Sequence, residues 1–284
     1  MLIKPMLPPK ADASDFLGRF REIISDPVNL LIERIPLAGI VHDNEVYLLN
    51  GNRVPVSGNG AYYGAFSQLL ILNRGVHEPL EEFVFQELLK HLPPAPQMIE
   101  LGAYWAHYSM WLKKVRPQAK NIMVEPNPTC LAAGRNNFAR NGFVGEFIQA
   151  AVSRGAWQVD QFLQSRTLDQ VDILHVDIQG LEVEMMEGAR DALRNARINY
   201  LFISTHSQQI HQEIIGQLKN FGYRVEVSSD FDYETTSYDG LIFSSSRRAK
   251  ALFTNFVALG RTTHATSRPE DVLQALEKIR RSVT

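Results

Sequence analysis

The segment Met98–Ser109, with the sequence MIELGAYWAHYS, decides the fold of this chain. Its first four residues predict a buried strand, Gly102–Tyr104 predict a tight turn, and the spacing of apolar residues from Ala106 onward predicts a helix. A strand, a glycine turn and a helix in succession are typical of open α/β sheets, in which ligands bind at the carboxyl ends of the strands. The segment therefore predicts a ligand site at this turn.

The residues of the turn distinguish between possible ligands. A dinucleotide fingerprint needs three glycines so that backbone amides can approach a pyrophosphate, whereas here Gly102 is followed by Tyr104 at the second glycine position. We therefore do not expect NAD or FAD. A carboxylate on the first strand, Glu100, and another after the next strand, Glu125, suit S-adenosylmethionine, which has a cationic ammonium and two ribose hydroxyls.

The composition indicates a folded protein with a sizeable core and excludes several classes. The chain has 284 residues, of which 45% are hydrophobic and 21% charged, as in globular domains. A net charge of -2 without a long basic run argues against a nucleic-acid partner. The single cysteine, Cys130, excludes an intramolecular disulfide and fits a reducing, cytoplasmic compartment. No apolar run reaches the roughly 18 residues of a membrane span, and the N-terminus does not resemble a signal peptide. The oligomeric state stays open.

Three regions are expected along the chain. Residues 1–75 predict a helix capped by Ser14 and a β-rich cap that contains a hairpin around Asn50. Residues 76–246 alternate strands with helices and end in two strands without a helix between them, which predicts an α/β, seven-stranded, mostly parallel Rossmann-like sheet with helices on both faces. Residues 247–284 predict a helical extension that starts with a capping box at Ser267.

Four stretches follow one another in an order known from one family. They are Glu100-Leu-Gly-Ala, Glu125-Pro-Asn-Pro, Asp177-Ile-Gln-Gly-Leu-Glu and Thr205-His206. The chain resembles the FkbM family of S-adenosylmethionine-dependent methyltransferases over roughly residues 75–245, although Tyr104, Ala106 and Gln179 replace the family's Asn, Gly and Glu. The resemblance implies the methyltransferase sheet and the O-methylation of a hydroxyl on a small molecule or sugar.

We expect the cofactor to lie along the first three strand ends. Glu100 would face its amino-acid end, and Glu125 would accept hydrogen bonds from both ribose hydroxyls. The exposed amides at the start of the helix after the turn favour its carboxylate. Further expected contacts are Gly102, Ala103 and Tyr104 in the turn, His107 and Ser109 at the helix start, Pro126 and Asn127 after the second strand, Gln149 and Ala150 near the adenine, and Asp177 beside the transferred methyl.

Asp177 and His206 are expected to carry the chemistry, because each ends one of two neighbouring strands. A carboxylate that orients an imidazole makes a general base, so His206 is expected to take the proton of the acceptor hydroxyl. Two alternatives stay open. Asp177 and His206 could hold a divalent metal that lowers the hydroxyl pKa, or the chain could be a binding or scaffold protein with the methyltransferase fold and no activity. His211 is expected on the surface of its helix.

Overall fold

The computed structural model describes residues 15–284, and its centre is a seven-stranded sheet in the order β6-β5-β4-β7-β8-β10-β9. The strands are β4 Gln97–Leu101, β5 Lys120–Val124, β6 Glu146–Ile148, β7 Val171–Val176, β8 Ile198–Thr205, β9 Arg224–Ser229 and β10 Gly240–Ser245. Strand β10 runs antiparallel to both of its neighbours, β8 and β9, whereas the pairings from β6 to β8 are parallel. The predicted fold class is confirmed.

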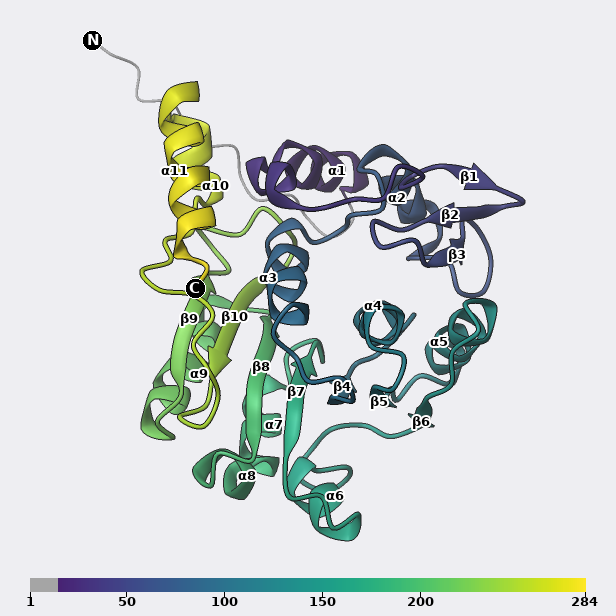
Figure 1. The fold of residues 1–284 in the computed structure, drawn as a ribbon, viewed down its shortest axis with the longest axis vertical. Helices are drawn as coiled ribbons and strands as arrows, with labels where there is room; N and C mark the ends of the chain where they lie inside the picture. The colour runs from purple at the N-terminus through teal and green to yellow at the C-terminus, as the bar shows by residue number, and fades with distance from the viewer. Residues whose placement is uncertain (1–14) are drawn as a thin grey trace.

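Helices cover both faces of this sheet (Figure 1). On one face lie α3 Pro79–Leu89, α4 His107–Val115 and α5 Pro128–Arg140, and on the other lie α6 Val159–Ser165, α7 Glu182–Gly188, α8 Arg190–Arg194 and α9 Gln208–Asn220. The spacing of apolar residues over 181–194 predicts one helix, but the structure has two, because the backbone leaves helical geometry at Ala189. Both faces are covered, so the central strands β7 and β8 read as nearly continuous apolar runs.

The N-terminal region adds helices and a small sheet above α4 and α5 (Figure 1). Its elements are α1 Phe16–Ser25, η1 Pro27–Leu31, β1 Val41–His42, β2 Glu45–Tyr47, β3 Arg53–Pro55, η2 Gly64–Ser67 and α2 Gln68–Leu72. The expected hairpin is present as the antiparallel pair β2–β3. The expected cap residue Ser14 lies outside the described residues, and Asp15 caps α1 by accepting a hydrogen bond from the Gly18 amide at 2.8 Å. Phe66 of this region packs in one core cluster with Trp105 and Phe138.

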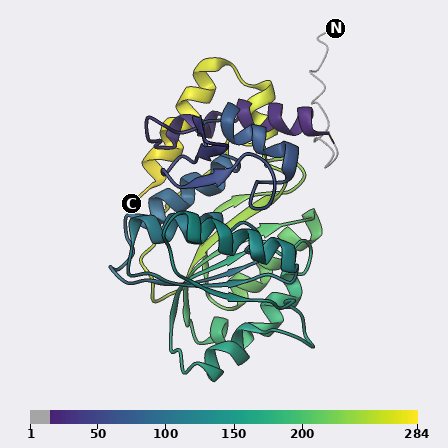
Figure 2. The same cartoon turned by 90° about the vertical axis from the view of Figure 1, so that its right-hand side faces the viewer.

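The C-terminal region contributes α10 Arg261–Thr266 and α11 Pro269–Ser282. The expected capping box is wrong: within the part of the chain described, α11 has Arg268 at its N-cap and no side-chain cap bond. Leu276 and Ile279 of α11 pack into the same core as Val28 and Phe83. Figure 2 accordingly shows α10 and α11 gathered with the N-terminal elements at one end of the molecule.

Candidate active site

A cavity of about 450 Å³ lies at the carboxyl ends of β4, β5 and β7. Ligand cavities typically measure about 300–1,000 Å³. Eight of the expected site residues line the cavity: Glu100, Gly102, Ala103, Tyr104, His107, Glu125, Asn127 and Asp177. Of the other expected residues, all within the described chain, none belongs to its lining: Ser109, Pro126, Gln149, Ala150 and His206. Gln149 is exposed to solvent, and Ala150 packs against the core cluster that contains Leu101 and Val176.

Gly102 allows the turn after β4 to lie directly against the end of β7. Its φ is +75°, and a Cβ atom at this position would lie 1.7 Å from the carbonyl oxygen of Asp177. Tyr104 and Ala106, at φ +40° and +62°, also have left-handed backbone conformations, which are unfavourable for residues with side chains. The glycine is therefore required by the contact between two strand ends, whatever the turn binds.

The backbone on both sides holds the carboxylate of Glu125. Its Oε2 accepts a hydrogen bond from the Tyr104 amide at 3.1 Å, and its Oε1 accepts one from the Asn127 amide at 2.9 Å. The Asn127 side chain in turn caps α5 by accepting from the Thr129 amide. These hydrogen bonds fix the orientation of the Glu125 carboxylate. A carboxylate oxygen accepts more than one hydrogen bond, so both oxygens can still accept hydrogen bonds from a ligand in the cavity.

Tyr104 connects this turn to the N-terminal region. Its hydroxyl accepts a hydrogen bond from the Tyr63 amide at 2.9 Å and donates one to the Ala61 carbonyl at 3.2 Å. The Tyr63 and Tyr104 rings lie 4.7 Å apart. Tyr104 therefore links the turn after β4 to residues 61–63 of the N-terminal region.

Glu100 and the first turn of α4 form a buried wall of the cavity. Glu100 is 3% exposed, and its Oε2 accepts a hydrogen bond from the Ser109 amide at 3.3 Å. Burial raises the pKa of Glu100. The ring of His107 stacks on Trp105 at 5.0 Å, and burial lowers the pKa of His107 to about 4. At neutral pH His107 is therefore an uncharged imidazole.

His206 lies among three carboxylates beside the cavity. Its Nε2 is 3.3 Å from Asp177 Oδ1 and 3.2 Å from Asp239 Oδ1, and its Nδ1 is 2.8 Å from Glu182 Oε1. Burial opposes the charge on the ring, but the hydrogen bonds to Asp177 and Glu182 and the charge of Asp239 raise the pKa of His206 to about 11. The same contact holds the pKa of Asp177 below its usual value, against the effect of burial. His206 therefore carries a proton at neutral pH.

Several residues of this site were not expected from the sequence. Asp239 directly precedes β10, whose antiparallel course pairs Gly240 with Thr205 and so brings Asp239 beside His206. The available signal was the position of Asp239 at the start of a strand that follows no helix. A carboxylate at the start of a helix is expected to interact with that helix terminus. Glu182 does accept a hydrogen bond from the Gly180 amide at 3.0 Å, but it also contacts His206 at 2.8 Å.

Two further histidines are buried. The Nε2 atom of His175 lies 2.6 Å from Glu81 Oε1. The expectation that His211 is a surface residue is wrong. Its ring is 2% exposed and lies between Thr205 Oγ1, at 2.8 Å, and Ser228 Oγ, at 2.9 Å. Helical spacing from His206 gave no indication that α9 turns this side chain toward the sheet.

Part of the chain matches a known family. Residues 152–225 match the family model of the Methyltransferase FkbM domain. The predicted resemblance to FkbM methyltransferases is confirmed. The matched FkbM segment contains Asp177, Glu182 and His206, whereas Glu125 and the turn after β4 precede it. This segment of the chain is similar to FkbM methyltransferases, for which S-adenosylmethionine is the methyl donor. The cavity volume and the oriented carboxylate of Glu125 fit that cofactor.

Solved methyltransferases are similar to the chain at low sequence identity. Precorrin-6y C5,15-methyltransferase from Geobacter metallireducens is 16% identical, with a TM-score of 0.44 over 58% of this chain and 89% of that one. TrmK from M. capricolum, in complex with S-adenosylhomocysteine, is 13% identical, with a TM-score of 0.45 over 70% of this chain and 96% of that one. At these values the likeness says nothing about the acceptor. No curated protein matches the chain. Among the residues described, no helix combines the length and apolar character needed to cross a bilayer.

Proposed function

We propose that this protein transfers a methyl group to a hydroxyl of a small molecule or sugar. The observation that carries the proposal is the group Asp177, His206 and Asp239, which gathers proton-handling side chains at the edge of the cavity that Glu125 also lines. Methylation of a hydroxyl requires removal of its proton, and a carboxylate and an imidazole in contact can take part in such a proton transfer.

In this proposal, bound S-adenosylmethionine supplies an electrophilic methyl group on a sulfonium. Glu125 accepts from the ribose hydroxyls, Glu100 lies toward the amino-acid end, and Gly102–Tyr104 line the turn beneath. Asp177 lies at the end of β7 beside the reacting centre. Alignment of the acceptor oxygen with the methyl group supplies most of the rate, about 7–11 kcal/mol in favourable cases.

The charge of His206 changes the roles expected for the proton transfer. A ring whose pKa is about 11 already holds a proton at neutral pH, so a neutral His206 does not serve as the base in the free protein. In our proposal the Asp177 carboxylate accepts the proton of the acceptor hydroxyl. His206 positions that carboxylate and is itself held by Glu182 at 2.8 Å. A positioned base contributes roughly 10²–10⁴-fold to the rate.

The test is methyl transfer from tritiated S-adenosylmethionine to a panel of hydroxylated small molecules and sugars. With a productive acceptor, Asp177→Asn is expected to lower turnover by roughly 10²-fold or more, while the affinity for S-adenosylhomocysteine changes less than tenfold. His206→Gln is likewise expected to lower turnover far more than the affinity for S-adenosylhomocysteine. His42→Gln is its matched control, because the His42 side chain is 70% exposed. Equal loss of affinity and turnover would contradict the assignment, and cofactor binding without turnover of any acceptor would favour the scaffold alternative.

A second candidate is the same methyl transfer assisted by a divalent cation. The observation that favours it is the third carboxylate: the ligand atoms of Asp177, His206 and Asp239 all lie within 4.8 Å of one another. Glu182 contacts the other ring nitrogen of His206, as carboxylates commonly do behind metal-bound histidines. A cation there would lower the pKa of the acceptor hydroxyl. Turnover that is abolished by EDTA and restored by Mg²⁺ would support this candidate, and turnover unchanged by EDTA would exclude it.

A further inference from the structure

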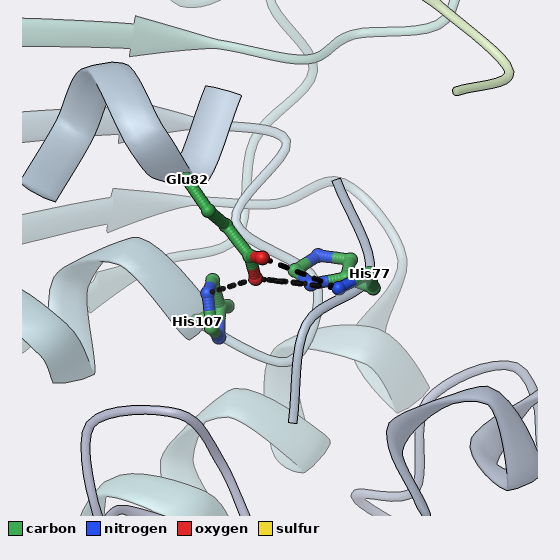
Figure 3. A group of neighbouring side chains, drawn as sticks. All are labelled: His77, Glu82 and His107. Carbon is green, nitrogen blue, oxygen red and sulfur yellow. Dashed lines mark hydrogen bonds and ion pairs between the residues drawn. The ribbon is translucent and has the colours of Figure 1, made fainter. Parts of the chain in front are cut away.

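A second group of convergent side chains comes from α3, α4 and the segment before α3 (Figure 3), and two of its members line the cavity. It consists of His77, which precedes α3, Glu82 on α3 and His107 at the start of α4. Glu82 Oε1 lies 2.8 Å from His77 Nδ1 and 3.1 Å from His107 Nε2. The three ligand atoms lie within 4.8 Å of one another.

These side chains are almost completely shielded from water. His77, Glu82 and His107 are 3%, 0% and 2% exposed. Figure 3 shows the Glu82 carboxylate between the two imidazole rings. Within the described chain, neither ring nitrogen of His107 has an aligned hydrogen-bond partner, although Nε2 faces the carboxylate. A buried polar atom without a hydrogen bond is costly, so a pairing of Glu82 with His77 alone does not account for His107.

We propose that His77 Nδ1, Glu82 Oε1 and His107 Nε2 bind one divalent first-row transition-metal ion, such as Zn²⁺ or Fe²⁺. Two imidazoles and one carboxylate are the donors that these ions prefer, whereas Mg²⁺ and Ca²⁺ select oxygen ligands. An ion at this position would coordinate His107 Nε2, which lies 3.1 Å from Glu82 Oε1 without an aligned hydrogen bond. His77 and His107 also line the cavity.

The surroundings of the group resemble the outer shell of a metal site. The other ring nitrogen of His77, Nε2, lies 3.4 Å from Glu78 Oε2, and that carboxylate accepts a hydrogen bond from the Tyr108 hydroxyl at 2.7 Å. Histidine ligands commonly have a carboxylate at the nitrogen that does not bind the metal, and this fixes the orientation of the ring. The site would join the segment before α3 to α4, and it is independent of the acceptor and of the proton transfer proposed above.

The experiment is a Co²⁺ titration of the EDTA-treated full-length protein, followed by visible absorption. We expect the wild type to bind one equivalent of Co²⁺ and to show a ligand-field band. In Glu82→Gln and His107→Gln, this band is expected to be lost or the affinity for Co²⁺ to fall at least tenfold. Glu81→Gln is the matched control, since Glu81 is a buried neighbour on α3 that contacts His175 and lies outside the group. His206→Asn is the control for the other possible metal site. No Co²⁺ band, or a band that disappears only with His206→Asn, would overturn the proposal.

Wild-type protein alone provides a second measurement, in case the variants do not fold. Pulsed EPR of the Cu²⁺-loaded protein counts imidazole ligands. The group His77, Glu82 and His107 predicts two coordinated imidazoles, whereas Asp177, His206 and Asp239 would supply one. A spectrum with one imidazole, or with none, would contradict the proposal regardless of how the variants behave.

Discussion

Replacement of Gly102 by alanine tests whether two strand ends in contact dictate the turn after β4. The new Cβ would lie 1.7 Å from the Asp177 carbonyl oxygen, and real Cβ contacts are essentially never shorter than 3.0 Å. The turn and the end of β7 must therefore separate by roughly 1.3 Å. The left-handed backbone costs about 1–2 kcal/mol and overpacking about 1–3 kcal/mol. Gly102→Ala is thus expected to lower the free energy of unfolding by about 2–5 kcal/mol.

Gly142→Ala is the matched control for this measurement. Gly142 has nearly the same φ, +73°, but a Cβ there would meet nothing within 4 Å. This variant is therefore expected to lose only the backbone contribution, about 1–2 kcal/mol. Urea unfolding followed by circular dichroism gives both values. If Gly102→Ala is no less stable than Gly142→Ala, the reasoning about the contact with Asp177 is refuted.

Two further predictions concern stability. Burial lowers the pKa of His211 to about 4, below the roughly 6.5 of a histidine in an unfolded chain. Protonation of the ring therefore favours the unfolded state. The free energy of unfolding is highest above pH 6.5 and falls by up to about 3 kcal/mol as the pH is lowered toward 4. Chemical unfolding at pH 7 and pH 4 should show this loss relative to His211→Gln, and identical pH dependence of the two proteins would contradict it. Tyr104→Phe removes the hydroxyl between Tyr63 and Ala61 and should cost about 1 kcal/mol; an unchanged midpoint of thermal unfolding would argue that this link does not hold the N-terminal region.

The sheet could be predicted because its signal is local and repeated. Apolar runs bounded by turns marked the strands, and the two final strands without a helix between them indicated the antiparallel strand that the structure shows as β10. The capping box at Ser267 failed because α11 begins two residues later, at Pro269, where proline is favoured in a first turn. The break at Ala189 likewise left no clear mark in the periodicity of residues 181–194.

The candidate site could be predicted only where a strand carries its own functional residue to the carboxyl edge. Parallel strands are directly followed by Glu125, Asp177 and His206, so the sequence predicts that these residues lie at the carboxyl edge of the sheet. Asp239 reaches the same place from the opposite direction, which depends on the pairing of β10 with β8. The contact of Glu82 with His107 was not readable, because it joins two helices whose packing depends on the completed core.

The most direct test of the account is calorimetric titration of the protein and of Glu125→Gln with S-adenosylhomocysteine. Both carboxylate oxygens of Glu125 already accept backbone hydrogen bonds, at 3.1 and 2.9 Å, and an amide can replace only one of these acceptors. The account predicts that the wild type binds one equivalent and that the variant binds roughly 10- to 150-fold more weakly, the equivalent of about 1.5–3 kcal/mol for hydrogen bonds to a charged group. Wild-type protein that shows no binding, or a variant with unchanged affinity, would contradict the central claim that this carboxylate holds the cofactor.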